Sequence, residues 1–542
     1  MDGIKLENQL EDGIKNLILK MEKDIKSKDS ELESKDKEID SLKKELEILR
    51  GQLINKNKKL FGKSSEQVDS HQITLFNEAE KECDLRKDEP TLEEITYIRK
   101  KPSQNTGKKD NLSNLEVVVI EHKLSQDKAI CNECNTPLIE IGKKEKDLLK
   151  YIPAKLYIER HVTYSYACKS CEEISEEANI ISTTSPKTLL HKSMASNELL
   201  AHSICLKYLY SLPLYRQENY FKMLDVKLSR QTLSNWMMGA AREFNIVYDF
   251  MRKELLKSNY IQADETTLKV IDNAGKESKS KKYMWLYKTH GDNDSIIIYD
   301  YQPTRSSSCP KAFLGDYSGY LQTDGYTGYN KVENAKRIYC LAHIRRKYYD
   351  IVSNLDKVAL KKSRAIIGFN YCEEIYKVEK ELREAYGEDE KFFEIRYKER
   401  VRYLAPIFDK FQKYVQVELE NALPKSPLGQ ALQYSQKLLP YMKTILEDGS
   451  LEVDNNAAER SIKPFVIGRK NWLFCNNKKG ANSSAIIYSI IETSKSNNLA
   501  VEKYLVYLMD FISSNPNPEE EYLLKVMPWS ETLPEDLKLQ KK

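Results

Sequence analysis

The N-terminal part of the chain carries a repeating pattern of apolar positions. Between Ile14 and Leu53, ten of twelve positions spaced alternately by four and three residues are apolar, and Lys28 and Lys35 occupy the other two. This spacing lines one face of a helix that pairs with a second helix along an apolar seam. We predict a leucine-zipper-like coiled coil in residues 1–62 that makes the protein a homo-oligomer. The alternative is a long amphipathic helix lying on its own domain.

A polar linker and a cysteine module follow the predicted coiled coil. Residues 63–110 are polar and rich in lysine, and residues 111–182 contain two Cys-x-x-Cys pairs. Two such pairs complete a tetrahedral site for Zn²⁺ with no position open for a reacting water, so the ion is expected to be structural. Aromatic and β-branched residues in 151–167 predict strands that fold back and bring the pairs together. The predicted ligands are Cys131, Cys134, Cys168 and Cys171. The alternative is four unligated thiols.

The pattern in residues 183–250 predicts helices, including a helix-turn-helix. Leu214–Leu224 form the first helix, Asp225–Leu228 the turn, and Ser229 the N-cap of the second helix. A helix that reads DNA needs a polar face for the groove and an apolar face for packing. The predicted apolar residues are Leu233, Trp236, Met237 and Ala240, and the DNA-contact candidates are Arg230, Gln231 and Asn235. The alternative is an ordinary helical hairpin.

Strand-like segments then follow one another within residues 251–500. They cover residues 259–264, 283–290, 295–302, 319–324 and a short strand that enters a helix within 337–350, with a further helix near Lys311–Leu314. Three adjacent strands, a crossover and two more strands is the order expected of a ribonuclease-H-like sheet. Asp264 and Asp324 each stand at the end of a predicted strand. We therefore expect both side chains to point into one cleft.

A third carboxylate would complete a site for phosphoryl transfer, because several carboxylates are needed to hold two divalent ions over one phosphate. Glu459 is the candidate, in an early turn of a helix whose start Asp454, Asn455 or Asn456 can cap. Periodicity alone does not select it from the 82 acidic residues. Between the second and third acids, residues from about 345 to 450 form a Lys- and Glu-rich helical stretch.

Composition limits the classes of protein to consider. The chain has 542 residues and a formal net charge of only +4, so a nucleic-acid surface must come from local clusters of charge. No apolar run approaches the roughly 18 residues of a bilayer-spanning helix, and the N-terminus is charged where a signal peptide is apolar. Ten cysteines in so long a chain favour metal binding over a disulfide framework. We expect a cytoplasmic, multidomain α+β protein without a membrane partner.

Several phrases of the sequence resemble the motifs of one known family. ADET, QTDGYTGYN, CLAHIRRKYYD and DNNAAERSIKPFVIGRKNWLF are similar, in this order, to signatures of the large transposase, often called TnpC, of the insertion-sequence family numbered sixty-six. That family is a DDE-type bacterial transposase family. KLFGKSSEQ, the two Cys-x-x-Cys pairs and SRQTLSNW fall where the family has its zipper, zinc-binding and helix-turn-helix segments. Motifs in the right order are more specific than any one alone.

The resemblance assigns roles to individual residues. It makes Asp264, Asp324 and Glu459 the catalytic triad, which implies two Mg²⁺ or Mn²⁺ ions per active site. It implies a ribonuclease-H-like catalytic domain in residues 251–500 with a helical insertion at about 345–450, followed by a C-terminal helix and tail in 501–542. Basic residues near the acids are suited to phosphate contacts. These candidates are His343, Arg345, Arg346, Arg460, Lys463, Arg469 and Lys470.

The implied function is DNA transposition in the bacterial nucleoid. Such an enzyme cleaves the ends of an insertion sequence and joins the freed 3′-OH to target DNA, without a covalent enzyme intermediate. The resemblance also implies small accessory transposition proteins as partners. One alternative is a catalytically idle, transposase-derived protein that binds DNA as a regulatory or architectural factor. Another is a metal-dependent nuclease without strand transfer.

Overall fold

The structure is a computed structural model that describes residues 154–167, 180–271, 281–290, 294–355 and 357–539, with a few isolated positions before residue 154. The chain divides into two compact units, Leu60–Lys155 and the remainder. The four predicted zinc ligands and the predicted linker lie outside the described residues, as does most of the predicted coiled coil. Within that coiled coil, the described positions Met21, Lys23, Ile25–Lys28 and Lys35 are helical.

A two-stranded antiparallel ribbon precedes the helices. Strand β1 (Ser165–Ala167) pairs with β2 (Ile180–Ser182), and Ser165 lies opposite Ser182. The ribbon confirms that the chain folds back after the aromatic and β-branched stretch. Paired strand is confined to the last three residues of that stretch, and residues 154–164 form neither helix nor strand.

Four helices come next, and two of them lie in the segment predicted as a helix-turn-helix. They are α4 (Asn197–Tyr208), α5 (Leu214–Met223), α6 (Arg230–Glu243) and α7 (Asn245–Leu255). Ser229 caps α6, with its side chain accepting a 3.1 Å hydrogen bond from the backbone N–H of Thr232. This cap confirms the predicted start of the second helix, because an N-cap hydroxyl satisfies a backbone donor that has no partner inside the helix.

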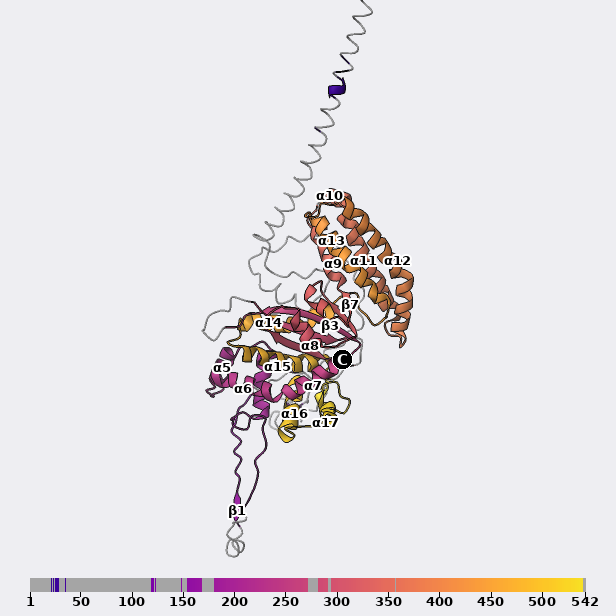
Figure 1. Cartoon of the computed structure of the whole chain (residues 1–542). Helices are drawn as coiled ribbons and strands as arrows, with labels where there is room; N and C mark the ends of the chain where they lie inside the picture. The colour runs from indigo at the N-terminus through magenta and orange to yellow at the C-terminus, as the bar shows by residue number, and fades with distance from the viewer. Residues whose placement is uncertain are drawn as a thin grey trace, which may run out of the picture. The chain divides into compact units, whose positions relative to one another are not determined.

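A mixed five-stranded sheet lies at the centre of the larger unit (Figure 1). Its strands are β3 (Tyr260–Leu268), β4 (Lys282–Thr289), β5 (Ile297–Gln302), β6 (Tyr320–Thr323) and β7 (Lys336–Tyr339), in the spatial order β5-β4-β3-β6-β7. The first three strands pair antiparallel, and β3, β6 and β7 pair parallel. Helix α8 (Ser308–Leu314) lies in the connection from β5 to β6, and the 3-10 helix η1 (Thr327–Lys331) follows β6. The predicted strand order is confirmed.

Helices from the C-terminal part cover this sheet. Helix α14 (Asn456–Trp472) packs on β3 and β4, and α15 (Lys478–Ser496) packs on β5. The Thr493 and Ser489 hydroxyls accept hydrogen bonds from the backbone of Ile297 and Tyr299 at 3.0 and 2.8 Å. Side chains of α15 therefore satisfy backbone groups along the outer edge of β5, which protects that edge from pairing with another chain.

The remaining helices fall into two groups. Between β7 and α14 the chain forms α9 (Leu341–Val352), α10 (Lys357–Lys362), α11 (Ala365–Tyr386), α12 (Phe392–Asn421), α13 (Pro427–Met442) and the 3-10 helix η2 (Lys443–Leu446). We call α10 to η2 the helical insertion. After α15 come α16 (Val501–Ser514), α17 (Glu520–Val526) and the 3-10 helix η3 (Glu535–Leu537).

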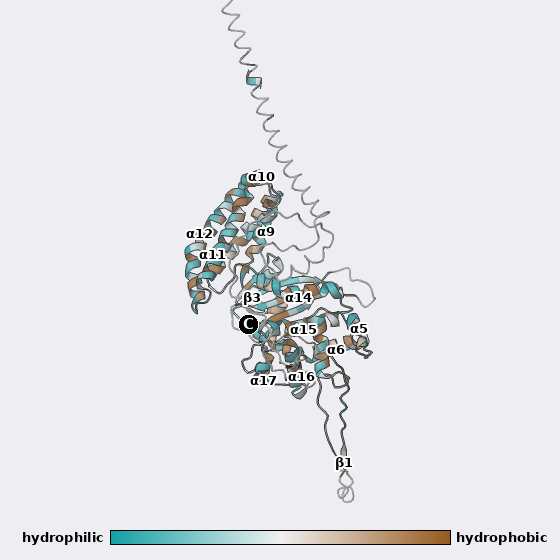
Figure 2. Ribbon diagram, turned by 180° about the vertical axis from the view of Figure 1, so that it is seen from behind, coloured by the Kyte–Doolittle hydropathy of each residue, from teal (hydrophilic) through white to brown (hydrophobic). Residues whose placement is uncertain are grey.

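Two hydrophobic cores hold these elements together. One joins helices α4–α7 and α14–α17 to the central strands, and the other joins β7 and α9 to the insertion. Figure 2 shows hydrophobic residues along the sheet and α15, whereas α11 and α12 alternate hydrophobic and hydrophilic residues. The second core extends from the sheet into the insertion, so that packing ties the insertion to the strand that precedes it. Within the described part of the chain, every helix is too short or too polar to cross a bilayer.

Candidate active site

Asp264 and Asp324 lie on neighbouring parallel strands. The register pairs Tyr260 with Tyr320 and Gln262 with Gln322, and the same register continued by two residues sets Asp264 beside Asp324. Asp324 directly follows β6, as predicted. The prediction that a strand ends at Asp264 is wrong, because β3 continues to Leu268 through its antiparallel pairing with β4. Only the pairing with β6 stops before Asp264.

Glu459 lies in the first turn of α14, as predicted. Asn455 occupies the N-cap position, but its side chain makes no capping hydrogen bond. Its amide instead donates a 2.9 Å hydrogen bond to the backbone carbonyl of Ala263 on β3. The backbone N–H of Ala458 donates to the side-chain oxygen of Gln262 at 3.2 Å. The start of α14 is therefore fixed directly against the strand that carries Asp264.

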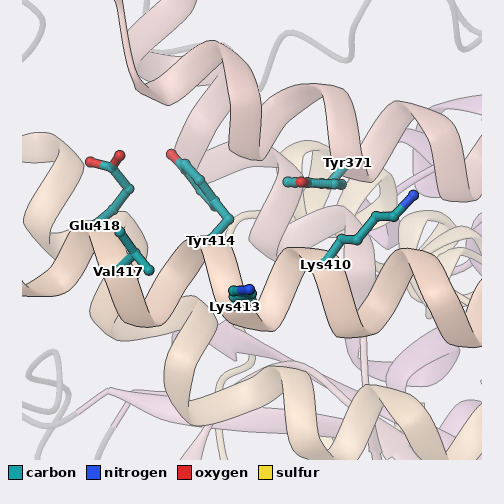
Figure 3. A pocket seen from close by; sticks show the side chains of 6 residues that line it. All are labelled: Tyr371, Lys410, Lys413, Tyr414, Val417 and Glu418. Carbon is teal, nitrogen blue, oxygen red and sulfur yellow. The ribbon is translucent and has the colours of Figure 1, made fainter.

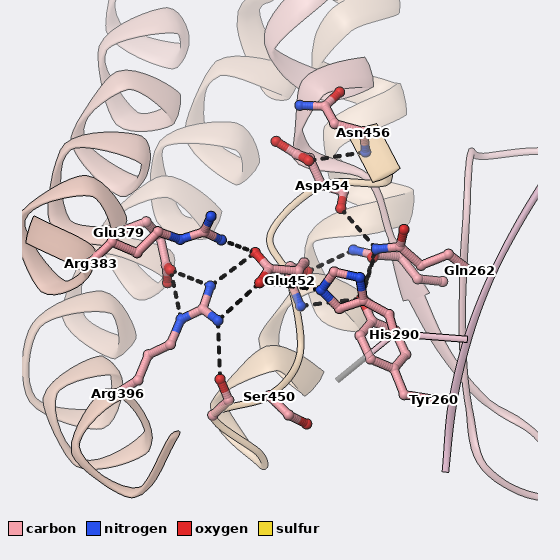
Figure 4. Close-up of polar contacts among 12 residues, drawn as sticks. Tyr260, Gln262, His290, Glu379, Arg383, Arg396, Ser450, Glu452, Asp454 and Asn456 are labelled. Atoms are coloured by element: carbon pink, nitrogen blue, oxygen red, sulfur yellow. Dashed lines mark hydrogen bonds and ion pairs between the residues drawn. The ribbon is translucent and has the colours of Figure 1, made fainter. Parts of the chain in front are cut away.

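A buried polar network holds the segment that leads into α14 (Figure 4). Arg396 of α12, completely buried, donates to Glu379 of α11 at 2.7 Å and to Glu452 at 3.0 Å. The backbone carbonyl of Glu452 accepts a 2.6 Å hydrogen bond from Gln322 of β6. Glu452 thus links the helical insertion to β6, the strand that directly precedes Asp324.

The far side of this network reaches other strands. His290, which follows β4, lies 3.5 Å from the Glu452 carboxylate, and the Tyr260 hydroxyl accepts a hydrogen bond from the Glu452 backbone N–H at 3.2 Å. Gln262 donates to the carbonyl of Asp454 at 3.3 Å. Buried charges are tolerated when they are paired and hydrogen-bonded, and the partners of Glu452 come from both the insertion and the sheet. These two parts together therefore fix the segment that precedes Glu459.

The three acids influence one another electrostatically. Burial raises the pKa of Asp264 well above its ordinary value, and the charges of Glu265, Glu459 and Asp324 raise it further. Burial also raises the pKa of Glu459, while the nearby His343, Lys463 and Arg346 oppose that rise. Carboxylates that repel one another in a partly buried site are held together most readily by cations.

Some of the predicted phosphate-contact residues lie near Glu459, and others do not. His343, Arg346 and Lys463 lie close enough to Glu459 to affect its pKa. Arg460 lies close enough to Asp454 to oppose the rise of its pKa caused by burial, and close enough to Lys288 to add to the lowering of its pKa by burial. These four residues are therefore gathered around the start of α14.

Three other candidates lie elsewhere. Arg345 pairs with Glu373 and stacks over Phe369, both of α11, so its guanidinium is directed into the insertion. Arg469 donates a 3.1 Å hydrogen bond to Thr266 of β3, which ties the last turn of α14 to the sheet. Lys470 is exposed on the next position of α14.

Glu265 and Arg305 belong to the site, although the sequence analysis did not select them. The Nε of Arg305 donates to the Glu265 carboxylate at 2.8 Å, and a guanidinium nitrogen lies 3.9 Å from Asp324. Glu265 directly follows Asp264, so the adjacent acid was a visible signal. Arg305 lies 40 residues further along the chain with no motif around it.

Models of known families match most of the chain. The model described as "Transposase IS66 family" matches residues 192–483, which include all three acids. This chain belongs to the IS66 transposase family. The model described as the zinc-finger binding domain of transposase IS66 matches residues 128–172, which include all four predicted zinc ligands. A third, described as "Transposase C of IS166 homeodomain", matches residues 48–120.

Similar proteins come from Sinorhizobium fredii. This IS66-family chain is 27% identical to "Uncharacterized protein y4jD" over 415 residues, which cover 74% of this chain and 78% of that protein. It is 27% identical to "Uncharacterized protein y4qI" over 409 residues, which cover 72% and 71% of the two chains. A third relative, "Uncharacterized protein y4hP", is 24% identical over 455 residues, covering 80% and 78%.

The residues of this IS66-family site fit divalent cations. Asp264, Asp324 and Glu459 offer carboxylate oxygens, the donors that Mg²⁺ and Mn²⁺ prefer. Cys340 and His343 also lie near Glu459, with ligand-type atoms of the three residues within 4.8 Å of one another. Cys340 is fully buried, burial raises the pKa of its thiol well above the ordinary value, and its sulfur accepts the backbone N–H of Asn455. This hydrogen bond helps to hold the start of α14.

A separate hollow of about 250 Å³ lies on α11 and α12 (Figure 3). Tyr414 and Glu418 in its wall contact Arg364 through hydrogen bonds of 2.7 and 2.9 Å. None of the three acids lines it. The lining residues are Tyr371, Lys410, Lys413, Tyr414, Val417 and Glu418.

Helix α6 of this IS66-family chain presents the two faces predicted for it. The four predicted apolar residues of α6 are buried, whereas Arg230, Gln231 and Asn235 are exposed. Gln231 donates a 2.9 Å hydrogen bond to Asn235, so that the two amides form one polar surface on the helix.

Proposed function

We propose that this protein is a DNA transposase that cleaves insertion-sequence ends and joins their 3′-OH groups to target DNA in a ribonuclease-H-like catalytic domain. The observation that carries the proposal is the convergence of Asp264, Asp324 and Glu459 from two parallel strands and a helix start within the region that matches the family. The charges of Glu459 and Asp324 both raise the pKa of Asp264, which supports the proximity of the three acids.

The three carboxylates would hold two Mg²⁺ or Mn²⁺ ions, which activate the attacking oxygen and stabilise the leaving oxygen when bound. In the cleavage step a water oxygen bonds to phosphorus, the bond from phosphorus to the 3′ oxygen breaks, and a 3′-OH is released. In the joining step this 3′-OH bonds to a target phosphorus, and one target phosphodiester bond breaks. His343, Arg346 and Lys463 attract the phosphate toward Glu459, because positive charge beside the acids offsets their repulsion of DNA.

Other parts of the chain supply DNA binding and assembly in this proposal. The exposed face of α6 with Arg230, Gln231 and Asn235 reads the transposon ends. The coiled coil joins protomers so that two active sites meet two ends. Met21 and Ile25, both on its apolar seam, are each 57% exposed in the single chain, which supports a partner helix.

Cofactor and partner assignments complete the proposal. Cys131, Cys134, Cys168 and Cys171 bind a structural Zn²⁺, supported by the zinc-finger family match. Small accessory transposition proteins are the proposed additional partners.

Strand transfer tests the proposal. Purified protein is incubated with Mg²⁺ or Mn²⁺, labelled DNA carrying the element's ends and a plasmid target, with Asp324→Asn assayed in parallel. We expect joined product with the wild type and none with the variant. If the protein cleaves the ends but does not join them, even when accessory proteins are added, it is a metal-dependent nuclease. If the wild type and Asp324→Asn both bind the DNA and neither cleaves it, the protein is a regulatory DNA-binding protein.

A further inference from the structure

A guanidinium group lies at the rim of the acidic cluster. Arg305 stands in the connection between β5 and α8, and its side chain is 40% exposed. It is anchored by Glu265, whose side chain is only 3% exposed. We propose that Arg305 binds a DNA phosphodiester beside Asp324 and that Glu265 is the positioning residue that holds the guanidinium there. The inference rests on the proposed function, because it names a substrate contact for the same site.

Both carboxylate oxygens of Glu265 are engaged within the protein. One oxygen accepts hydrogen bonds from Nε and a terminal nitrogen of Arg305, and the other accepts a 2.7 Å hydrogen bond from the Tyr329 hydroxyl. Tyr329 is fully buried, so this support is rigid. Glu265, the neighbour of Asp264, thus pairs with the guanidinium of Arg305. This distinguishes Glu265 from the three proposed metal ligands.

The plane of the guanidinium is fixed as well. It stacks over the Tyr326 ring at 3.8 Å, and the Tyr326 hydroxyl donates back to the carbonyl of Arg305. The backbone N–H of Tyr326 donates to the Asp324 carboxylate at 2.9 Å, so Tyr326 orients both Arg305 and Asp324. A Cβ on Gly328 would collide with the Tyr326 ring, which explains a glycine at this position. A guanidinium held flat keeps the fork that matches a phosphate.

The distance to Asp324 separates a phosphate-binding role from a purely structural ion pair. The guanidinium nitrogen lies 3.9 Å from the Asp324 oxygen, beyond hydrogen-bond range. Of its five N–H groups, two serve Glu265, which leaves donors for a phosphate at the acids. Four carboxylates at the site repel a polyanion, and a fixed cation at their edge offsets that repulsion.

Salt-dependent DNA binding tests the role of Arg305. The full-length protein binds fluorescent duplexes carrying the element's ends, without added divalent ion, over a series of KCl concentrations. For Arg305→Gln we expect roughly tenfold weaker binding near physiological salt, and a slope of log affinity against log salt that is smaller by about 0.9. A random duplex should lose the same factor. Arg305→Lys should keep the slope but recover only part of the affinity.

Control variants separate this contact from other effects. Arg364→Gln removes an arginine of similar exposure, 45%, that also pairs with a carboxylate, Glu418, but lies on the insertion. It should leave affinity and slope unchanged. Glu265→Gln should weaken DNA binding like Arg305→Gln, yet both should still bind Mn²⁺ in calorimetry, whereas Asp264→Asn should not.

Each result decides the inference. Unchanged affinity and slope in Arg305→Gln, with a lower unfolding temperature, would reduce Arg305 to a structural ion pair and overturn the proposal. Loss of Mn²⁺ binding in Glu265→Gln would make Glu265 a metal ligand and also overturn it. If the wild-type protein carries out strand transfer but the salt slope of Arg305→Gln is unchanged, the Arg305 inference alone is rejected. A changed slope in a protein that never cleaves DNA would keep the contact and reject the transposase function.

Discussion

The side-chain amide of Asn455 donates a 2.9 Å hydrogen bond to the carbonyl of Ala263, the residue before Asp264. Asn455 is 1% exposed, so this bond is shielded from water. It spans 192 residues of sequence and joins the start of the helix carrying Glu459 to the strand carrying Asp264. This amide is therefore one of the direct links that set the spacing between the first and third acids.

Replacing that amide tests its contribution. Asn455→Ala leaves the Ala263 carbonyl without its donor, and we expect a loss of about 1–3 kcal/mol in local stability. Strand transfer should fall further than this loss alone predicts, because Glu459 is displaced relative to Asp264. Asn456→Ala is the adjacent control, since Asn456 contributes its backbone N–H to Asp454. Equal activity of the two variants would show that Asn455 does not set the geometry.

Glu452 should be important for docking the helical insertion. Glu452→Gln removes one partner of a buried ion-pair network, which costs about 3–5 kcal/mol when the remaining charges stay buried. We expect faster hydrogen exchange in α11, α12 and the segment before α14, together with reduced strand transfer. Asp409→Asn breaks an exposed pair with Lys443 instead and should cost less than about 1 kcal/mol. Equal exchange in both variants would contradict the docking role.

Asp300 should make the sheet less stable as pH rises. Burial raises its pKa from 3.8 to about 6, although a hydrogen bond from Gln302 and the charge of Arg252 oppose this. Between about pH 4 and 6 the folded protein retains a proton that the unfolded chain has released, so stability falls as pH rises through that window. The stability gained by Asp300→Asn over wild type should grow by about 2 kcal/mol from pH 4 to pH 7.

Hydrogen exchange of the β5 amides measures this change locally. The exposed Asp316 provides the control, because Asp316→Asn makes the same chemical change at a side chain open to water. A constant effect of Asp300→Asn at all pH values would show that Asp300 has an ordinary pKa.

The exposed face of α6 should discriminate between DNA sequences. Replacing Gln231 or Asn235 by alanine should cost about 1–3 kcal/mol of preference for the correct ends over random DNA, since paired amides read base edges. Arg242→Ala, near the end of the same helix, is the control because Arg242 pairs with Glu243. Competition binding with specific and random duplexes measures the preference. An unchanged preference would make α5 and α6 an ordinary helical hairpin.

Local patterns predicted much of the fold. Ser229 and the apolar spacing after it fixed α6, because a cap and a buried face are encoded within a few residues. The alternation of strands and helices between residues 259 and 350 gave the order of the sheet. The extension of β3 past Asp264 was missed, because it depends on pairing with β4 and not on the local sequence.

The candidate site was harder to predict from the residues alone. Neither periodicity nor spacing selected Glu459 from the other acids, and only the resemblance to a family did so. The pairing of Arg305 with Glu265 joins residues 40 positions apart, and that of Glu452 with Arg396 joins residues 56 apart. Such contacts are determined by tertiary packing. The predicted zinc module lies outside the described residues and stays a prediction.

The placement of the insertion between β7 and α14 has a consequence for synthesis of the protein. The ribosome completes both aspartates and the five strands before it makes the helices that separate Asp324 from Glu459 by 135 residues. A nascent chain can thus pair its sheet while the third acid is still missing. A chain that stops within the insertion therefore still lacks Glu459, one of the three proposed metal ligands.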